Sequence, residues 1–279
     1  MLFPMDALFT TRVAATLIWT LGALAALPAW SDAGGEEIPT VSVAAPAYWC
    51  PYACDAAGPR WGFAVEIALT ALGSSGYSVN YRNLPYDRAL VEARVGRVDT
   101  TVPTFRDEAP DFVFPEHAVS STEYCFYLPE NKSWRYAGPG SLHGIDFVAT
   151  SGYSYGKKID AYIATHREER VTLIQGEDIP ERLQKMVQMG RYDALLEDRL
   201  LFESSQSSDG LANAGCLEER HAGYLALSPQ NPDRSRTIAE AFDRGFERIR
   251  SDGGICRILA EYGLGSHFVP SLEEDECLR

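Results

Sequence analysis

Residues 147–174 read FVATSGYSYGKKIDAYIATHREERVTLI, and this stretch decides the expected fold. The run Phe147–Thr150 is apolar and β-branched, which predicts a short strand. A turn rich in glycine and serine follows, then a helical pattern over Tyr153–Thr165, then a second β-branched run at Val171–Ile174. A strand, a helix and a strand in this order predict two parallel strands with the helix packed across them.

The same alternation continues on both sides of this stretch. Downstream, the patterns predict a helix over Ile179–Met189, a strand over Tyr192–Leu196 and a helix over Arg199–Ser205. Upstream, they predict strands over Ile38–Ala44, Tyr77–Tyr81 and Val98–Val102, with helices over Phe63–Leu72 and from Pro85 to Gly96. We therefore expect an α/β protein in which mostly parallel sheets are flanked by helices.

The two alternating units are separate in the chain. Predicted strands at Cys125–Leu128 and Tyr224–Leu227 stand between them, and two helices close the sequence. We therefore expect one lobe from residues 38–126 plus 223–279 and a second, inserted lobe from residues 127–222. Two lobes joined by two crossing strands form a hinge, and small ligands bind between such lobes.

The N-terminus predicts export. Arg12 precedes an apolar run over Val13–Leu27, and small residues follow around Ala33. This layout is typical of a signal peptide over residues 1–33, cleaved near Ala33, and it predicts a periplasmic location. A membrane anchor is the alternative, but the run is shorter than the ~20 residues that a spanning helix needs.

Charge and motifs exclude several classes of function. The chain of 279 residues has a formal net charge of −14, which argues against nucleic acid or an anionic membrane as partners. The sequence contains no phosphate-binding loop, no dinucleotide fingerprint and no paired-histidine zinc motif. We expect no cofactor, no metal and no enzymatic activity, and a monomer that binds a small molecule.

Six cysteines suggest disulfides, because the count is even and the chain is expected to be exported. Six cysteines allow 15 pairings, and spacing does not choose among them. Our hypothesis is that Cys50 pairs with Cys54, Cys125 with Cys216 and Cys256 with Cys277. A metal site is the weaker alternative, because Cys50 and Cys54 lack a second nearby pair of ligands.

The turn at Gly152–Gly156 has two interpretations. It fits the G-x-S-x-G pattern of a nucleophile elbow with Ser154 as nucleophile. The partners of such a hydrolase would come from downstream residues, namely Asp193, Asp198, His221 and His267. The favoured interpretation is a turn whose backbone N–H groups, from Gly152 through Tyr153 to Ser154, bind an anion at the start of a helix.

Charged and aromatic residues follow the predicted strands. Arg106, next to Thr104, follows one strand and could take a carboxylate with two parallel hydrogen bonds. Asp198 follows a strand of the other lobe and could take an ammonium group. Tyr48 and Tyr86 are candidate walls of the same pocket, whereas Trp61 is interpreted as loop packing.

The order of these motifs resembles the bacterial extracellular solute-binding proteins of family 3, over about Val41–Leu264. The segments that carry the resemblance are Gly62–Ile67, Tyr86–Leu90, Gly96–Asp99, Arg106–Phe112, Ser151–Ser154, Gly190–Ala194 and Gly253–Gly263. The resemblance implies a two-lobed, type II periplasmic-binding-protein-like fold. It also implies an amino acid or related carboxylate as ligand, for delivery to an ABC-type permease or a sensor.

In the matched motifs, Arg106 corresponds to the arginine that holds the ligand carboxylate, and Asp198 to the carboxylate that holds its ammonium. The segment before Arg106 departs from the family, since Pro103-Thr104-Phe105 replaces the usual threonine pattern. Some family relatives are cyclohexadienyl or arogenate dehydratases. An enzyme of that kind is the alternative function, with Glu197, Asp198 or His117 as the candidate general acid.

Overall fold

The computed structural model describes residues 38–167, 169–176, 178–205, 208–273 and 275–278. Ile38–Arg279 forms one compact unit. The expected signal peptide over residues 1–33 lies outside the described residues and stays a prediction. Across the described ranges, no helix has both the length and the apolar character needed to cross a membrane.

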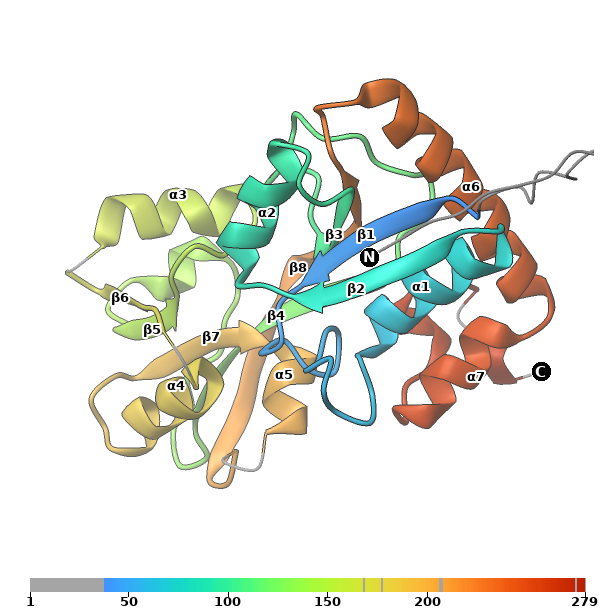
Figure 1. Ribbon diagram of the computed structural model, residues 1–279. Coiled ribbons are helices and arrows are strands. Elements are labelled where there is room, and N and C mark those ends of the chain that lie inside the picture. The colour runs from blue at the N-terminus through green and yellow to red at the C-terminus, as the bar shows by residue number, and fades with distance from the viewer. Residues whose placement is uncertain (1–37, 168, 177, 206–207, 274, 279) are drawn as a thin grey trace, which may run out of the picture. The chain divides into compact units, whose positions relative to one another are not determined.

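One sheet of eight strands runs through the unit in the order β2-β1-β3-β8-β4-β7-β5-β6 (Figure 1). In its first half, β1 (Thr40–Ala45) pairs in parallel with β2 (Ser78–Asn83) and with β3 (Thr100–Thr104). In its second half, β5 (Phe147–Thr150) pairs in parallel with β6 (Val171–Ile174) and with β7 (Ala194–Asp198). We call the elements around β1–β3 lobe 1 and those around β5–β7 lobe 2.

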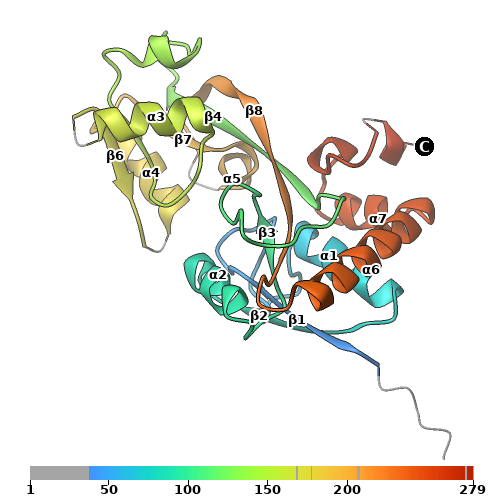
Figure 2. The same ribbon diagram turned by 90° about the horizontal axis from the view of Figure 1, so that it is seen from above.

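Helices cover both faces of lobe 1, because alternate residues of β1 point to opposite sides. Val41 and Val43 share a core cluster with α1 (Phe63–Ser74), α6 (Pro232–Ser251) and α7 (Gly254–Glu261). Ala44 packs instead with α2 (Tyr86–Arg94). Figures 1 and 2 show the two sets of helices on opposite sides of the strands.

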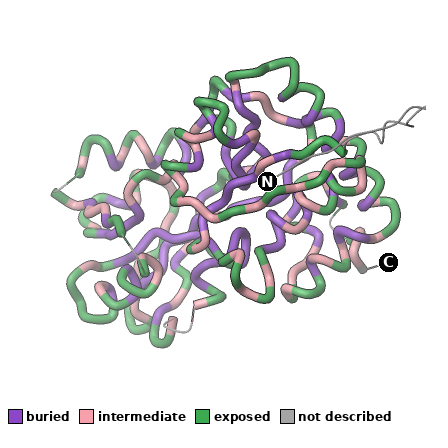
Figure 3. Tube along the Cα trace, in the orientation of Figure 1, coloured by how far each residue is buried: buried purple, intermediate pink, exposed green. Residues whose placement is uncertain are grey.

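Helices also cover both faces of lobe 2. Phe147 packs with α3 (Lys157–His166), and Val148 packs with α4 (Ile179–Gln188) on the other face. A short helix, α5 (Arg199–Ser204), starts directly after β7. Figure 3 shows that buried residues concentrate on the strands, whereas exposed residues lie on the outer sides of helices and loops.

Two long antiparallel strands, β4 (Ser120–Pro129) and β8 (Leu211–Leu227), join the lobes. β8 pairs with β3 in lobe 1, and β4 pairs with β7 in lobe 2. Three single-turn segments, η1 (Pro139–Leu142), η2 (Ser266–Phe268) and η3 (Glu276–Leu278), complete the elements. The α/β class and the two crossing strands agree with the expected fold, whereas the exact lobe limits at residues 126/127 and 222/223 stay a prediction.

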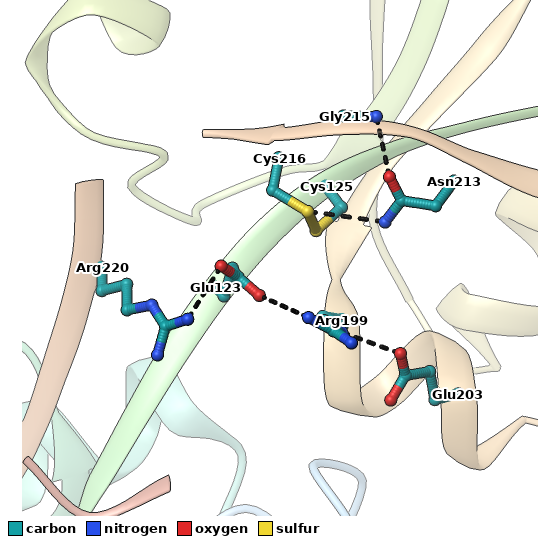
Figure 4. Close-up of a disulfide and its surroundings, with 8 residues drawn as sticks. All are labelled: Glu123, Cys125, Arg199, Glu203, Asn213, Gly215, Cys216 and Arg220. Carbon is teal, nitrogen blue, oxygen red and sulfur yellow. Dashed lines mark hydrogen bonds and ion pairs between the residues drawn. A yellow bond between two sulfur atoms is a disulfide. The ribbon is translucent and has the colours of Figure 1, made fainter. Parts of the chain in front are cut away.

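Three disulfides are present, Cys50–Cys54, Cys125–Cys216 and Cys256–Cys277, the pairs favoured from the sequence. Cys125–Cys216 joins β4 to β8 within the crossing strands (Figure 4). Beside it, Glu123 pairs with Arg199 of α5 and Arg220 of β8. The two strands that connect the lobes are therefore linked covalently as well as by their backbone ladder.

Some element limits differ from the expected ones. The strand expected over Tyr192–Leu196 runs to Asp198, so Glu197 and Asp198 are buried strand residues rather than loop residues. The helix expected to start at Tyr153 starts at Lys157. There the side chain of Asp160 accepts from the Tyr155 N–H and from Ser154 Oγ at 2.8 Å each, which holds the preceding turn outside the helix.

Candidate functional site

A small cavity with a free volume of about 20 Å³, room for about one water molecule, lies where loops of both lobes meet. The loops follow the carboxyl ends of parallel strands β1, β3 and β5, the usual ligand position in α/β sheets. Its lining consists of Pro46, Tyr48, Trp49, Tyr86, Phe105, Glu108, Tyr124 and Tyr153. Six of these eight residues are aromatic, so the cavity is walled mainly by ring faces and edges.

Trp49 lies at the centre of the aromatic wall. Its ring is stacked on Tyr52, with centroids 4.9 Å apart, and meets the edge of Phe105 at 6.1 Å. From lobe 2, the ring of Tyr153 lies 6.3 Å from that of Trp49. The Cys50–Cys54 disulfide closes the loop just after Trp49 and holds the indole against its neighbours.

Tyr48 and Tyr86 form the outer part of the wall. The Tyr86 N–H donates to the Tyr48 hydroxyl at 3.3 Å, which ties the start of α2 to the loop after β1. Burial raises the pKa of Tyr86, and also those of Tyr124 and Tyr153, far above the ordinary tyrosine value. These phenols are therefore neutral walls at physiological pH and carry no anionic charge.

Glu108 is the one charged side chain among the described residues of the lining. Its carboxylate accepts from the Tyr86 hydroxyl at 2.5 Å and from the Phe105 N–H at 3.3 Å. Burial raises the pKa of Glu108 to about 7, although these hydrogen bonds oppose the rise. The Ser154 backbone N–H of lobe 2 is also near enough to lower this pKa, so Glu108 faces the turn of the opposite lobe.

The structure places Arg106, expected to hold a ligand carboxylate, outside the cavity lining. Phe105 lines the cavity, whereas Arg106 begins the turn at residues 106–108 and lies outside the lining. The guanidinium lies over the Tyr224 ring at 4.2 Å and the Phe114 ring at 5.2 Å, and it donates to the Pro115 carbonyl at 2.7 Å. Arg106 is thus occupied outside the cavity.

Asp198 does not line the cavity either. It is fully buried and caps α5 by accepting from the Leu201 N–H at 2.8 Å, while its other oxygen accepts from the Tyr52 hydroxyl at 3.0 Å. Burial raises its pKa to about 7. Because Tyr52 belongs to lobe 1, Asp198 joins the two lobes, and it lies outside the cavity lining.

Some of the other expected site residues line the cavity, and some do not. Tyr48, Tyr86 and Tyr153 line the cavity, whereas Thr104, Gly152 and Ser154 do not. Thr104 is buried at the end of β3. The positive φ of 86° at Gly152 bends the chain after β5, which turns Tyr153 toward the cavity.

The groups considered for catalysis are engaged elsewhere. Ser154 Oγ donates to Asp160, and no contact described for it involves a histidine. His117 pairs with Glu247 at 3.0 Å and stacks on Phe246 of lobe 1. Glu197 is 1% exposed and lies outside the cavity lining. Neither a serine nucleophile nor any of the three proposed acids therefore reaches the cavity.

One group of potential metal ligands occurs among the described residues, namely Glu123, Cys125 and Cys216. Both cysteines are oxidised in a disulfide, and the carboxylate is shared between two arginines (Figure 4). Metal binding at cysteine requires the thiolate, so this group does not form a metal centre.

Sequence reasoning missed four contributors to the lining besides Pro46: Trp49, Phe105, Glu108 and Tyr124. Two of these residues could have been suspected from the sequence, because Phe105 and Glu108 lie close to Arg106 in the same loop after β3. Tyr124 carries no such signal, since its position depends on the pairing of β4 with β7.

Solved structures resemble this chain over most of its length. A putative L-cystine ABC transporter protein from Listeria monocytogenes matches with a TM-score of 0.64 and 16% identity, covering 85% of this chain and 100% of that one. A histidine kinase sensor domain with similarity to periplasmic binding proteins has a TM-score of 0.64 and 15% identity, covering 80% and 95%.

The chain has the periplasmic-binding-protein fold. An ancestral amino acid-binding protein, described as a precursor of cyclohexadienyl dehydratase, matches with a TM-score of 0.61 and 11% identity, covering 80% and 94%. A scan of protein-family models finds no match, and neither does a search of curated proteins. At these identities the likeness establishes the architecture alone.

Proposed function

We propose that this protein is an exported solute-binding protein that captures a small solute between its lobes. The observation that carries the proposal is the cavity itself, whose walls come from loops of both lobes. A ligand that contacts both lobes favours the closed arrangement by its differential affinity for it. The Tyr52–Asp198 hydrogen bond and the Trp49–Tyr153 contact are the interlobe contacts that closure would form.

The names of the structural neighbours support a role in transport or sensing. They include arginine-binding proteins, a putative cystine transporter protein and a kinase sensor domain. By analogy, the closed form would act in the periplasm as a monomer and be recognised by an ABC-type permease or a sensor. An amino acid is a ligand to test, although Arg106 lies against Tyr224 and Pro115 outside the cavity lining.

Intrinsic fluorescence and thermal unfolding test the proposal. A bound solute should change the emission of Trp49, and at 100 times its Kd it should stabilise the fold by about 2.7 kcal/mol. Trp49→Phe should remove the fluorescence response. The matched control is Trp61→Phe, because Trp61 packs on Tyr81 outside the cavity and should leave the response intact.

A second candidate is an enzyme that uses Glu108 as general acid. A carboxyl group with a pKa of about 7 in a water-poor cavity suits that role. Turnover of arogenate or prephenate to an aromatic product, lost in Glu108→Gln, would establish the enzyme. Binding without turnover would leave the solute-binding function standing alone.

A further inference from the structure

The crossing strands β4 and β8 have a second face, which is turned away from the cavity between the lobes. On the first face, Tyr124 of β4 lines that cavity, and the ring of His221 of β8 lies 5.6 Å from the Tyr124 ring. Side chains alternate along a strand, so the adjacent residues Glu123 and Arg220 point to the other face. These two residues stand opposite each other in the pairing of β4 with β8.

A groove lies over this second face. It consists of two hollows with free volumes of about 400 and 630 Å³, and the hollows share the lining residues Ser121, Arg220 and His267. Ligand pockets typically have volumes of ~300–1,000 Å³, whereas the cavity between the lobes has a free volume of about 20 Å³. The groove therefore has room for a small molecule without any movement of the lobes.

Both lobes supply walls to the groove. From lobe 2, α5 contributes Leu200 and the charged residues on either side of it, Arg199 and Glu203. From lobe 1, the segment that follows α7 contributes a mostly apolar wall, which consists of Tyr262, Leu264, Phe268, Val269, Pro270 and Leu272. An occupant would therefore lie against apolar side chains on one side and polar side chains on the other.

Ser121 places an unused hydroxyl at the floor of the groove. The residue is 8% exposed and lines both hollows. Its backbone carbonyl accepts from the Tyr52 hydroxyl at 3.3 Å, but no hydrogen bond among the described residues uses its side chain. A buried hydroxyl without a partner is unfavourable. A polar group bound in the groove would remove that penalty.

Arg220 has unused donors beside this hydroxyl. Its Nη2 atom donates to Glu123 at 3.1 Å (Figure 4), and this is the one side-chain polar contact of Arg220 within the described part of the chain. A guanidinium carries five N–H donors in a planar fork, so most of them remain available. Arg199, by contrast, is held by both Glu123 and Glu203. A ligand carboxylate could take two parallel hydrogen bonds from Arg220.

The nearby acidic residues limit the charge of the ligand. Glu123 and Glu203 line the same hollow as Arg220, and like charges repel at short range. A phosphate monoester carries about −1.5 to −2 charges at pH 7, so it would be repelled more strongly than a carboxylate with a single charge. The wall from lobe 1 suits a hydrocarbon body rather than further polar groups.

We infer that this groove is a second ligand site, which binds a small organic carboxylate with an apolar body. The carboxylate accepts hydrogen bonds from Arg220 and Ser121, and the body packs against Leu264 and Phe268. The site lies on the opposite face of the crossing strands from the cavity, so the inference goes beyond the proposed function.

The test is calorimetry on the full chain with phenylacetate and 4-methylpentanoate, each compared with its amide, which has nearly the same shape and no charge. At least one carboxylate should bind, and at least about tenfold more tightly than its amide, because a charged hydrogen bond to Arg220 distinguishes the two. Failure of both carboxylates to bind, or equal affinity for acid and amide, would overturn the inference.

A charge-removing variant locates the bound carboxylate. Arg220→Gln should weaken carboxylate binding by about tenfold or more and leave the amide unchanged. The matched control is Arg170→Gln. Arg170 is also partly exposed and has one acidic partner, Asp146 at 3.0 Å, but it lies outside the groove. Its replacement should leave carboxylate affinity unchanged.

Two further variants act on the floor of the groove. Ala222→Leu should weaken carboxylate binding by about tenfold, because it fills the hollow and retains the Arg220–Glu123 pair. Ser121→Ala should weaken binding by about fivefold through the loss of one hydrogen bond. Unchanged carboxylate affinity in folded samples of both Arg220→Gln and Ala222→Leu would also overturn the inference.

A cavity variant separates this inference from the proposed function. Should phenylacetate binding be weakened by Glu108→Gln and not by Arg220→Gln, the ligand binds between the lobes. The groove inference is then wrong, and the solute-binding function survives. Should carboxylates bind at Arg220 while no solute changes the emission of Trp49, the groove inference stands and the proposed function fails.

Discussion

Removal of the Cys125–Cys216 disulfide should destabilise the protein more than removal of either other disulfide. The bridge joins residues 91 positions apart, whereas Cys50–Cys54 spans 4 positions. Loop-closure entropy in the unfolded chain scales with the logarithm of loop length, which predicts about 4.6 kcal/mol for the long loop and about 2 kcal/mol for the short one. The difference arises in the unfolded chain, not in the native contacts.

The measurement compares the double variants Cys125→Ala/Cys216→Ala and Cys50→Ala/Cys54→Ala. Alanine is the appropriate replacement because Cys125 is fully buried among apolar side chains. Each kcal/mol shifts the midpoint of a chain of this size by about 2–4 °C, so losing the crossing-strand disulfide should lower Tm by about 9–18 °C. Urea unfolding of the oxidised proteins gives the free energies directly.

Equal losses in the two double variants would refute the loop-length reasoning. The pair Cys256–Cys277, 21 positions apart, provides an internal check with an intermediate prediction of about 3.3 kcal/mol. Because Cys125–Cys216 lies in the strands that connect the lobes, its removal should also broaden the range of lobe arrangements seen by small-angle scattering.

Three further predictions concern packing and pH. Gly245→Ala should destabilise the fold by about 1–3 kcal/mol in urea unfolding, because a Cβ there would lie 1.9 Å from the Ala71 carbonyl oxygen. A loss of unfolding free energy below a few tenths of a kcal/mol would contradict this prediction. Tyr52→Phe should cost about 1–3 kcal/mol, since Asp198 loses a buried donor, and unchanged stability would mean that this hydrogen bond does not hold the lobes. Burial raises the pKa of Glu197 to about 8, so the folded state keeps a proton that the unfolded chain loses near pH 4.5. Stability should therefore fall as pH rises from about 4.5 to 8, and Glu197→Gln should flatten that part of the pH profile measured by thermal unfolding.

The sequence predicted the architecture because architecture depends on periodic patterns. The run from Phe147 to Ile174 alternates strand and helix, and the structure has β5, α3 and β6 there. The pattern of β1 likewise assigns Val41 and Ala44 to opposite faces, where separate helix layers cover them. Such information is local, because the pattern of neighbouring residues in the chain is enough to show which side of a strand or helix a side chain occupies.

The site was predicted only in part, because it depends on where loops from distant segments meet. Tyr48 and Tyr86, expected as pocket walls, lie in the lining, and so does Tyr153, which was expected to contribute only its backbone N–H. Arg106 follows β3 and Asp198 ends β7, yet Arg106 is held outside the cavity by Tyr224 and Asp198 is hydrogen-bonded to Tyr52. Both competing partners lie far away in the sequence.

The sequence by itself thus determined the α/β class and the two crossing strands, and it pointed to Tyr48 and Tyr86 as residues near the cavity. Only the tertiary structure decided that Glu108, rather than Arg106, brings charge to the cavity. The physical reason is that burial and charge pairing depend on every segment that packs around a side chain. For Glu108 those segments are the loop after β1, the start of α2 and the turn after β5.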